Sequence, residues 1–239
     1  MNYLALIISG LVIALFLALF LAAARSRREK MARQEKRVSA LGFRPLEKAP
    51  PELTDKLSGL RLSDQRRQFQ LDHVYHRADF DQDFYLVDVV DSSDEQDMWL
   101  GPETLVVVSP HLALPRFTLI SLPEMEDQGI MVDLAEKMLE SAFSWMAGSL
   151  GVERIDFPSS PDFETRYVVF GSSQAAVRSL FTPSLIDYLM GVTLPLTLEG
   201  EGDLFAAGLS YTSSRKRKPM LNDLYREVID LARVLKRGS

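Results

Sequence analysis

The 239-residue sequence contains no cysteine. This absence excludes disulfides, thiolate nucleophiles, and zinc or iron–sulfur sites that depend on cysteine ligands. The sequence also lacks a Gly-x-x-x-x-Gly-Lys-Ser/Thr phosphate loop, a Gly-x-Ser-x-Gly nucleophile elbow and a His-Glu-x-x-His metal motif. The chain therefore carries none of these common signatures of nucleotide hydrolysis, acyl transfer or metalloproteolysis.

Charge is missing from one long segment near the N-terminus. Leu4 to Ala24 is a run of 21 residues with no charged side chain, and its one polar side chain is Ser9. As a helix this run would be about 31 Å long, which matches a bilayer core of roughly 30 Å. A cleaved signal peptide is the rival interpretation, but it has a shorter apolar core and a basic segment before it. We therefore predict a retained transmembrane anchor over residues 1–24.

Basic residues are concentrated directly after the apolar run. Seven stand between residues 25 and 37 against two glutamates, although the whole chain has a net charge of −6. The positive-inside rule then places the N-terminus outside and the large domain in the cytosol. An acidic domain on a basic stalk is not typical of a nucleic-acid binder, so we expect a membrane surface as the partner of the stalk. The topology-setting residues are Arg25, Arg27, Arg28, Lys30, Arg33, Lys36 and Arg37.

The next boundary is marked by helix-breaking residues. The basic segment has strong helix formers up to Leu41, and Gly42, Pro45, Pro50 and Pro51 then interrupt it. We interpret residues 25–59 as a juxtamembrane helix and a proline-containing linker, with a short helical turn at Leu53–Leu57. Residues 60–239 then form one cytosolic domain of ordinary size.

Strand and helix patterns in that domain do not alternate regularly. Alternating or β-branched runs predict strands at 68–75, 84–90, 105–108, 117–122, 155–157, 167–170, 194–198 and 204–211. Helical periodicity predicts helices at 131–150, from Ser172 or Ser173 to 180, 182–190 and 219–236. We therefore predict an α+β fold, a mainly antiparallel sheet with about four helices.

The candidate catalytic residues are few. His73 and His76 would point to opposite faces of a strand, and His111 lies in a proline-containing turn. Asp79, Asp81 and Asp83 imitate the start of a calcium loop, but Phe84 and Val90 occupy the positions that need glycine and glutamate. We predict polar turns here, and no catalytic, metal or cofactor site is assigned.

Two basic features remain. The cluster Arg215, Lys216, Arg217 and Lys218 precedes the last predicted helix. It is either a solvated turn or a patch for anionic lipid or an acidic partner. Arg178, in the largely apolar segment 176–181, is either a core-edge ion pair or a binding residue.

A resemblance to a known protein family rests on three segments, residues 114–119, 161–171 and 176–181. Together they resemble a family of uncharacterised bacterial proteins with one N-terminal membrane anchor, over residues 61–235. The resemblance implies a bacterial inner-membrane setting and no known activity, and it transfers no functional residues.

The function class follows from these features taken together. We expect a membrane-tethered, non-catalytic binding or scaffold module, anchored in lipid and bound to a protein partner, with no cofactor and no nucleic acid. The alternative is a hydrolase that uses carboxylates of the Asp79–Asp97 region, with or without a metal ion.

Overall fold

The computed structural model describes residues 25, 32, 34–60, 69–79, 81–91, 104–122, 151–209 and 221–238. The chain divides into two compact units, Met1–Arg44 and Pro45–Ser239. The predicted anchor Leu4–Ala24 lies outside the described residues. Among the helices that are described, none is both long enough and apolar enough to cross a bilayer.

The described part of the first unit is the end of a helix. Residues 34–40 are helical, and Gly42 ends the helix with a positive φ of 83°. Phe43 N donates to Val38 O at 3.3 Å, and Gly42 N donates to Ser39 O at 2.9 Å. This is a glycine C-cap, which satisfies carbonyls that the last turn leaves unpaired. The predicted helix break at Gly42 is confirmed.

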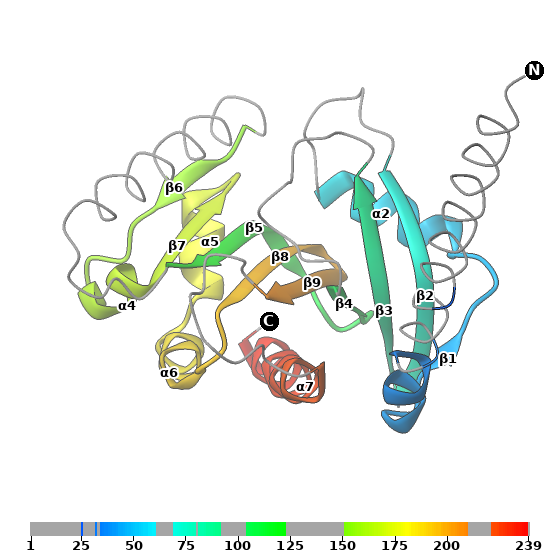
Figure 1. Cartoon of the computed structure of the whole chain (residues 1–239). Helices are drawn as coiled ribbons and strands as arrows, with labels where there is room; N and C mark the ends of the chain where they lie inside the picture. Colours follow the sequence, from blue (N-terminus) through cyan, green and yellow to red (C-terminus); the bar gives the residue numbers. More distant parts are fainter. Residues whose placement is uncertain are drawn as a thin grey trace, which may run out of the picture. The chain divides into compact units, whose positions relative to one another are not determined.

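The second unit is built on one antiparallel sheet, as predicted (Figure 1). Its strands follow the order β2-β3-β4-β9-β8-β5-β7-β6, and neighbouring strands pair antiparallel. The bounds are β2 Phe69–Asp79, β3 Gln82–Asp91, β4 Thr104–Val108, β5 Leu114–Ser121, β6 Glu153–Ile155, β7 Tyr167–Gly171, β8 Leu196–Gly202 and β9 Leu204–Leu209. The two-residue strand β1, Arg44–Pro45, crosses the division between the units.

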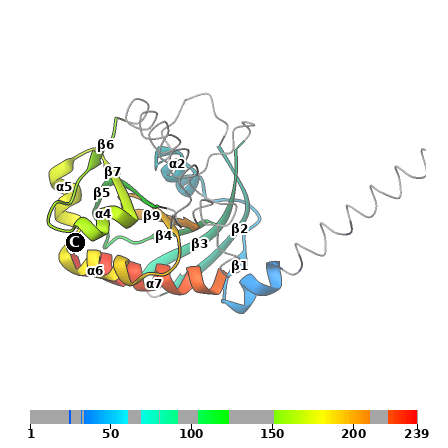
Figure 2. The same ribbon diagram turned by 60° about the vertical axis from the view of Figure 1, so that its left-hand side comes forward.

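Strands β2, β3, β4 and β9 form what we call the hairpin half. Helix α2, Pro51–Leu60, buries Leu53, Leu57 and Leu60 in a cluster with Val74, Val87, Val106, Leu204 and Ala206. Helix α7, Leu221–Gly238, lies on the other side of the sheet (Figures 1 and 2). Its Tyr225 ring meets the Phe84 ring edge-on at 6.0 Å. Both faces of β4 are thereby covered, and Leu105, Val106 and Val107 are fully buried.

Strands β8, β5, β7 and β6 form what we call the aromatic half. Three short helices belong to it: α4 Pro161–Arg166, α5 Gln174–Leu180 and α6 Pro183–Gly191. Its centre is the aromatic cluster, Phe117, Phe157, Phe163, Tyr167 and Phe181, whose contacting rings have centroids 5.2 to 6.0 Å apart. Gly200 permits this packing, because a Cβ there would lie 2.5 Å from the Phe117 ring.

Helix caps in the aromatic half follow the sequence prediction. Ser173 accepts a hydrogen bond from Ala176 N before α5, and Thr182 accepts one from Leu185 N before α6. Pro183 stands in the first turn of α6, where its missing N–H costs no helical hydrogen bond. Local chemistry therefore determines where these two helices begin.

Several details differ from the sequence prediction. The short helical turn expected at Leu53–Leu57, within a linker up to residue 59, is part of the longer helix α2, which packs into the second unit beginning at Pro45. Helix α4 was not predicted. The regular alternation expected of the strand at 68–75 is interrupted, because β2 contains a bulge between Asp72 and Tyr75. At this bulge His73 has a φ of 48° and is exposed, while Val74 and Tyr75 are both buried. The predicted helix 131–150 lies outside the described residues.

The β6 end of this sheet has features that discourage further pairing. Strand β6 has only three residues, two of them charged. Short strands and charges are common protections of sheet edges against association.

Candidate functional site

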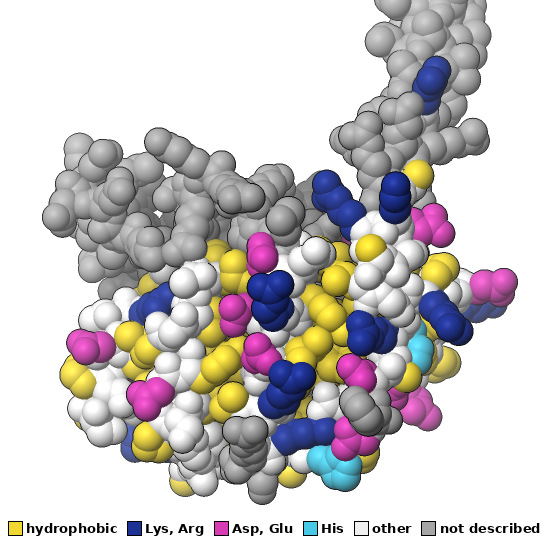
Figure 3. Space-filling view, turned by 90° about the horizontal axis from the view of Figure 1, so that it is seen from below, with side chains coloured by type: hydrophobic (Ala, Val, Ile, Leu, Met, Phe, Trp, Pro, Cys, Tyr) yellow, Lys and Arg dark blue, Asp and Glu magenta, His cyan; other side chains and the backbone are white. Residues whose placement is uncertain are grey.

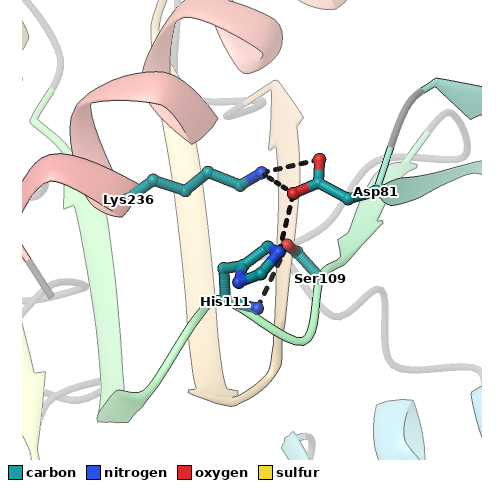
Figure 4. A network of polar contacts seen from close by, with 4 residues as sticks. All are labelled: Asp81, Ser109, His111 and Lys236. Carbon is teal, nitrogen blue, oxygen red and sulfur yellow. Dashed lines mark hydrogen bonds and ion pairs between the residues drawn. The ribbon is translucent and has the colours of Figure 1, made fainter.

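One polar contact among the described residues of the second unit joins three distant segments (Figure 4). Asp81 lies in the turn between β2 and β3, His111 follows β4, and Lys236 is in the last turns of α7. Lys236 Nζ donates to both Asp81 carboxylate oxygens, at 3.0 and 3.1 Å. His111 Nε2 lies 2.8 Å from Asp81 Oδ2. We call these three residues the Asp81 clasp.

The electrostatics of the Asp81 clasp favour a structural role. The hydrogen bond from Lys236 lowers the pKa of Asp81, with smaller contributions from the charges of Lys236 and His111, against a weaker opposing effect of burial. A carboxylate with a lowered pKa is a weaker proton acceptor. The side chains are also largely in solvent, 45% exposed for Asp81 and 60% for His111. Water and salt therefore screen the contact.

Ser109 lies beside the clasp and raises the question of a serine–histidine–aspartate triad. Its hydroxyl accepts a hydrogen bond from the backbone N–H of His111 at 3.4 Å. Ser109 is 0% exposed, and His111 Nε2 is directed at Asp81. A nucleophile must instead bond to its base and face the substrate. The arrangement is therefore a turn stabilised by a buried serine.

The other two histidines pair with aspartates of strand β3. His73 Nδ1 lies 3.6 Å from Asp88 Oδ2, and His76 Nε2 lies 2.7 Å from Asp83 Oδ1. The His76 ring also stacks on Tyr85 at 4.8 Å. Burial, and then the charges of Asp83 and Glu52, raise the pKa of Tyr85. The two histidines therefore bind different aspartates instead of sharing a ligand.

The three aspartates that imitate a calcium loop are separated by their partners. Arg77 Nη2 lies 3.5 Å from Asp79 Oδ2, Lys236 and His111 bind Asp81, and His76 binds Asp83. Across the described parts of the chain, no three His, Asp or Glu side chains converge in a way that could hold a metal ion. Residues 92–97 of the acidic run lie outside those parts.

A buried polar row on the sheet was not predicted. Glu199 of β8 stands opposite Thr118 of β5 and Ala206 of β9, and Thr197 is two positions along the same strand. Glu199 is 7% exposed and Thr197 is 0% exposed. Among the described residues, the Thr197 hydroxyl has no hydrogen-bond partner. Burying an unpaired hydroxyl is destabilising.

The row separates two apolar clusters on the same sheet face. One is the α2 cluster, which contains Ala206 and Val106. The other contains Ile120, Val152, Val168 and Phe170. The alternation Leu196-Thr197-Leu198-Glu199 is the only sequence signal for the row, and such alternation normally marks a strand with one face in solvent. Nothing in the sequence alone shows that the polar side is covered.

Arginines of the aromatic half bind backbone carbonyls. Arg166 Nη1 donates to Met190 O at 2.6 Å, its Nη2 donates to Val192 O, and Tyr167 Oη donates to Leu189 O at 2.8 Å. These bonds satisfy the C-terminal carbonyls of α6. Arg178, predicted as an ion pair or a binding residue, is exposed and its Nε donates to Asp156 O at 3.0 Å.

The basic residues singled out in the sequence lie partly outside the described residues. Arg215, Lys216, Arg217 and Lys218 lie outside the described residues, as do Arg27, Arg28, Lys30 and Arg33. Arg25, Lys36 and Arg37 are described and are exposed. On the face of the molecule seen from below, basic and acidic side chains of the described residues are interspersed among hydrophobic ones (Figure 3).

Comparisons with known proteins give little further information. No protein-family model matches the chain, and no curated protein matches it. Among solved structures, the mycobacterial trehalose monomycolate transport factor A, TtfA, aligns with a TM-score of 0.47 and 10% identity. The alignment covers 85% of this chain and 94% of that one. A likeness at this level carries no functional assignment.

Proposed function

We propose that this chain is a membrane-tethered, non-catalytic binding or scaffold module. The observation that carries the proposal is the pairing of Asp79, Asp81, Asp83 and Asp88, each with a basic side chain of the same unit. These carboxylates are the candidates for chemistry in this sequence. The contacts of Asp79, Asp83 and Asp88 lie within the β2–β3 hairpin, and those of Asp81 join the hairpin to His111 and to helix α7. Each of these carboxylates therefore already has a partner within the chain, without a substrate.

The proposed setting is the cytosolic face of a bacterial inner membrane. Leu4–Ala24 would span the bilayer with the N-terminus outside, and the basic stalk would lie beside the inner leaflet. The anchor confines the domain to a thin layer, which raises its effective concentration toward other membrane proteins. The proposed partners are membrane lipid, through the anchor, and a protein, with no role for nucleic acid.

The topology can be tested with a reporter at the C-terminus of the full-length chain. A reporter that is active only in the periplasm should be inactive, and a cytosolic reporter should be active. A control chain with Arg25, Arg27 and Arg28 changed to glutamine should have a weaker preference for this membrane orientation, because those residues are the basic flank of the anchor. Periplasmic activity of the unmodified chain, or a mature N-terminus after Ala24, would contradict the proposed orientation.

Binding can be tested by proximity labelling in intact membranes, with the labelling enzyme at the C-terminus of the full-length chain. The matched control is residues 1–44 fused to the same enzyme, which keeps the anchor and stalk and removes the second unit. A binding module should label at least one protein that this control does not. Identical labelling by the two fusions would overturn the proposal, because the second unit would then recruit nothing.

The hydrolase alternative makes a separate prediction about divalent ions. If the Asp79–Asp97 region held a catalytic metal, the full-length protein in detergent should bind Mg²⁺, Mn²⁺, Ca²⁺ or Zn²⁺. Its thermal midpoint should then rise by mass action, and D83N should lose the rise while D162N, a control at an exposed carboxylate of α4, should retain it. The binding-module proposal expects no metal-dependent rise in any of the three proteins.

The basic cluster Arg215–Lys218 is proposed as a second contact of the domain with anionic lipid or with an acidic partner. Each basic residue near an anionic surface contributes about 1 kcal/mol at low salt. In full-length protein reconstituted into bilayers, cross-linking from this segment to lipid head groups should be greater with anionic lipid and should fall with added salt. Changing all four residues to glutamine should remove the difference. Equal cross-linking in neutral and anionic bilayers would identify the cluster as a solvated turn.

A further inference from the structure

We draw no further inference here: the strongest candidate, the buried polar pair Thr197 and Glu199 on the α2 side of the sheet, carries nothing because no described feature beside it shows what would bind there.

Discussion

The hairpin half and the aromatic half belong to one sheet, but the residues that stand out in their sequences make different interactions. In the hairpin half, the conspicuous histidines and aspartates form polar contacts at turns and on strand surfaces, such as His111 with Asp81 and His76 with Asp83. In the aromatic half, the conspicuous segment 161–171 supplies Phe163 and Tyr167 to a buried ring cluster.

The comparison shows that clusters of charged residues and clusters of aromatic residues contribute differently to folding stability. Exposed ion pairs contribute little to folding, because solvent screens them and ordered side chains lose entropy. Buried aromatic side chains contribute much more, through area removed from water and through ring contacts. We therefore expect substitutions in the aromatic cluster to be severe and substitutions in the Asp81 clasp to be mild. Four substitutions test these expectations, and they follow from the largest expected effect to the smallest.

The largest effect is expected for Phe163→Ala. Phe163 is 1% exposed and contacts the rings of Phe157, Tyr167 and Phe181. Removing a buried phenylalanine ring leaves a cavity, so the free energy of unfolding should fall by about 3–5 kcal/mol. Urea unfolding of the full-length protein in detergent, followed by circular dichroism, measures the change. Phe163→Leu retains much of the side-chain volume and should lower the free energy of unfolding by less. A loss below about 1 kcal/mol for Phe163→Ala would contradict the expected importance of the aromatic cluster.

A smaller loss is expected for Arg166→Met. This change retains much of the apolar stem of the side chain but removes the donors to Met190 O and Val192 O at the end of α6. Leaving half-buried carbonyls unpaired should cost about 1–3 kcal/mol. Arg166→Lys is the matched control, since one ammonium group can restore part of the bonding. The same unfolding measurement decides, and equal stability of all three proteins would show that water replaces the guanidinium without loss.

Substitution in the buried polar row of strand β8 should change stability in the opposite direction. Thr197→Val keeps the shape of the side chain and removes a buried hydroxyl that has no partner among the described residues. The free energy of unfolding should therefore rise by about 1 kcal/mol. Ser121→Ala is the control on the neighbouring strand, because Ser121 Oγ donates to Leu196 O at 2.8 Å, and its removal should be destabilising. A destabilised Thr197→Val protein would mean that the hydroxyl is satisfied after all.

The smallest effect is expected for Asp81→Asn, and it should appear mainly as a change in pH dependence. The hydrogen bond from Lys236 lowers the pKa of Asp81 in the folded chain. The stability it contributes is therefore present above the ordinary aspartate pKa of about 4 and is lost as the pH falls through the lower, folded value. Unfolding midpoints between neutral and acidic pH should fall less steeply for Asp81→Asn than for the unmodified protein. High salt should make the two curves converge, and a large loss at neutral pH would show that the clasp matters more than its exposure suggests.

Local sequence signals predicted much of this fold correctly. Strands β3, β4, β5 and β7, and helices α5, α6 and α7, appear close to the residues that periodicity and capping indicated. The hairpin β8–β9 also appears around Gly202, which has a φ of 60°. These elements depend on side-chain alternation, cap hydroxyls and glycine, all of which act over a few residues. The antiparallel sheet and the α+β class followed from their order.

The errors arise where distant contacts override local signals. The linker expected up to residue 59, with only a short helical turn at Leu53–Leu57, contains the longer helix α2, because Leu53, Leu57 and Leu60 complete an apolar cluster with four strands. His73 matches the alternation of a strand, but the bulge in β2 turns it out to solvent and brings Val74 into that cluster. Helix α4 has only six residues, too few to produce a periodic pattern.

By itself the sequence determined the absence of cysteine chemistry, the uncharged run Leu4–Ala24, the basic residues that follow it and the starting points of the capped helices. Each of these is a property of composition or of neighbouring residues. Tertiary structure alone decided that Asp81 meets both His111 and Lys236, that Thr197 and Glu199 are covered, and that Arg166 binds the end of α6. These contacts join residues that are 24 to 155 positions apart or depend on which surface a strand packs against. They form only when burial of the apolar clusters has offset the entropy of bringing such distant segments together.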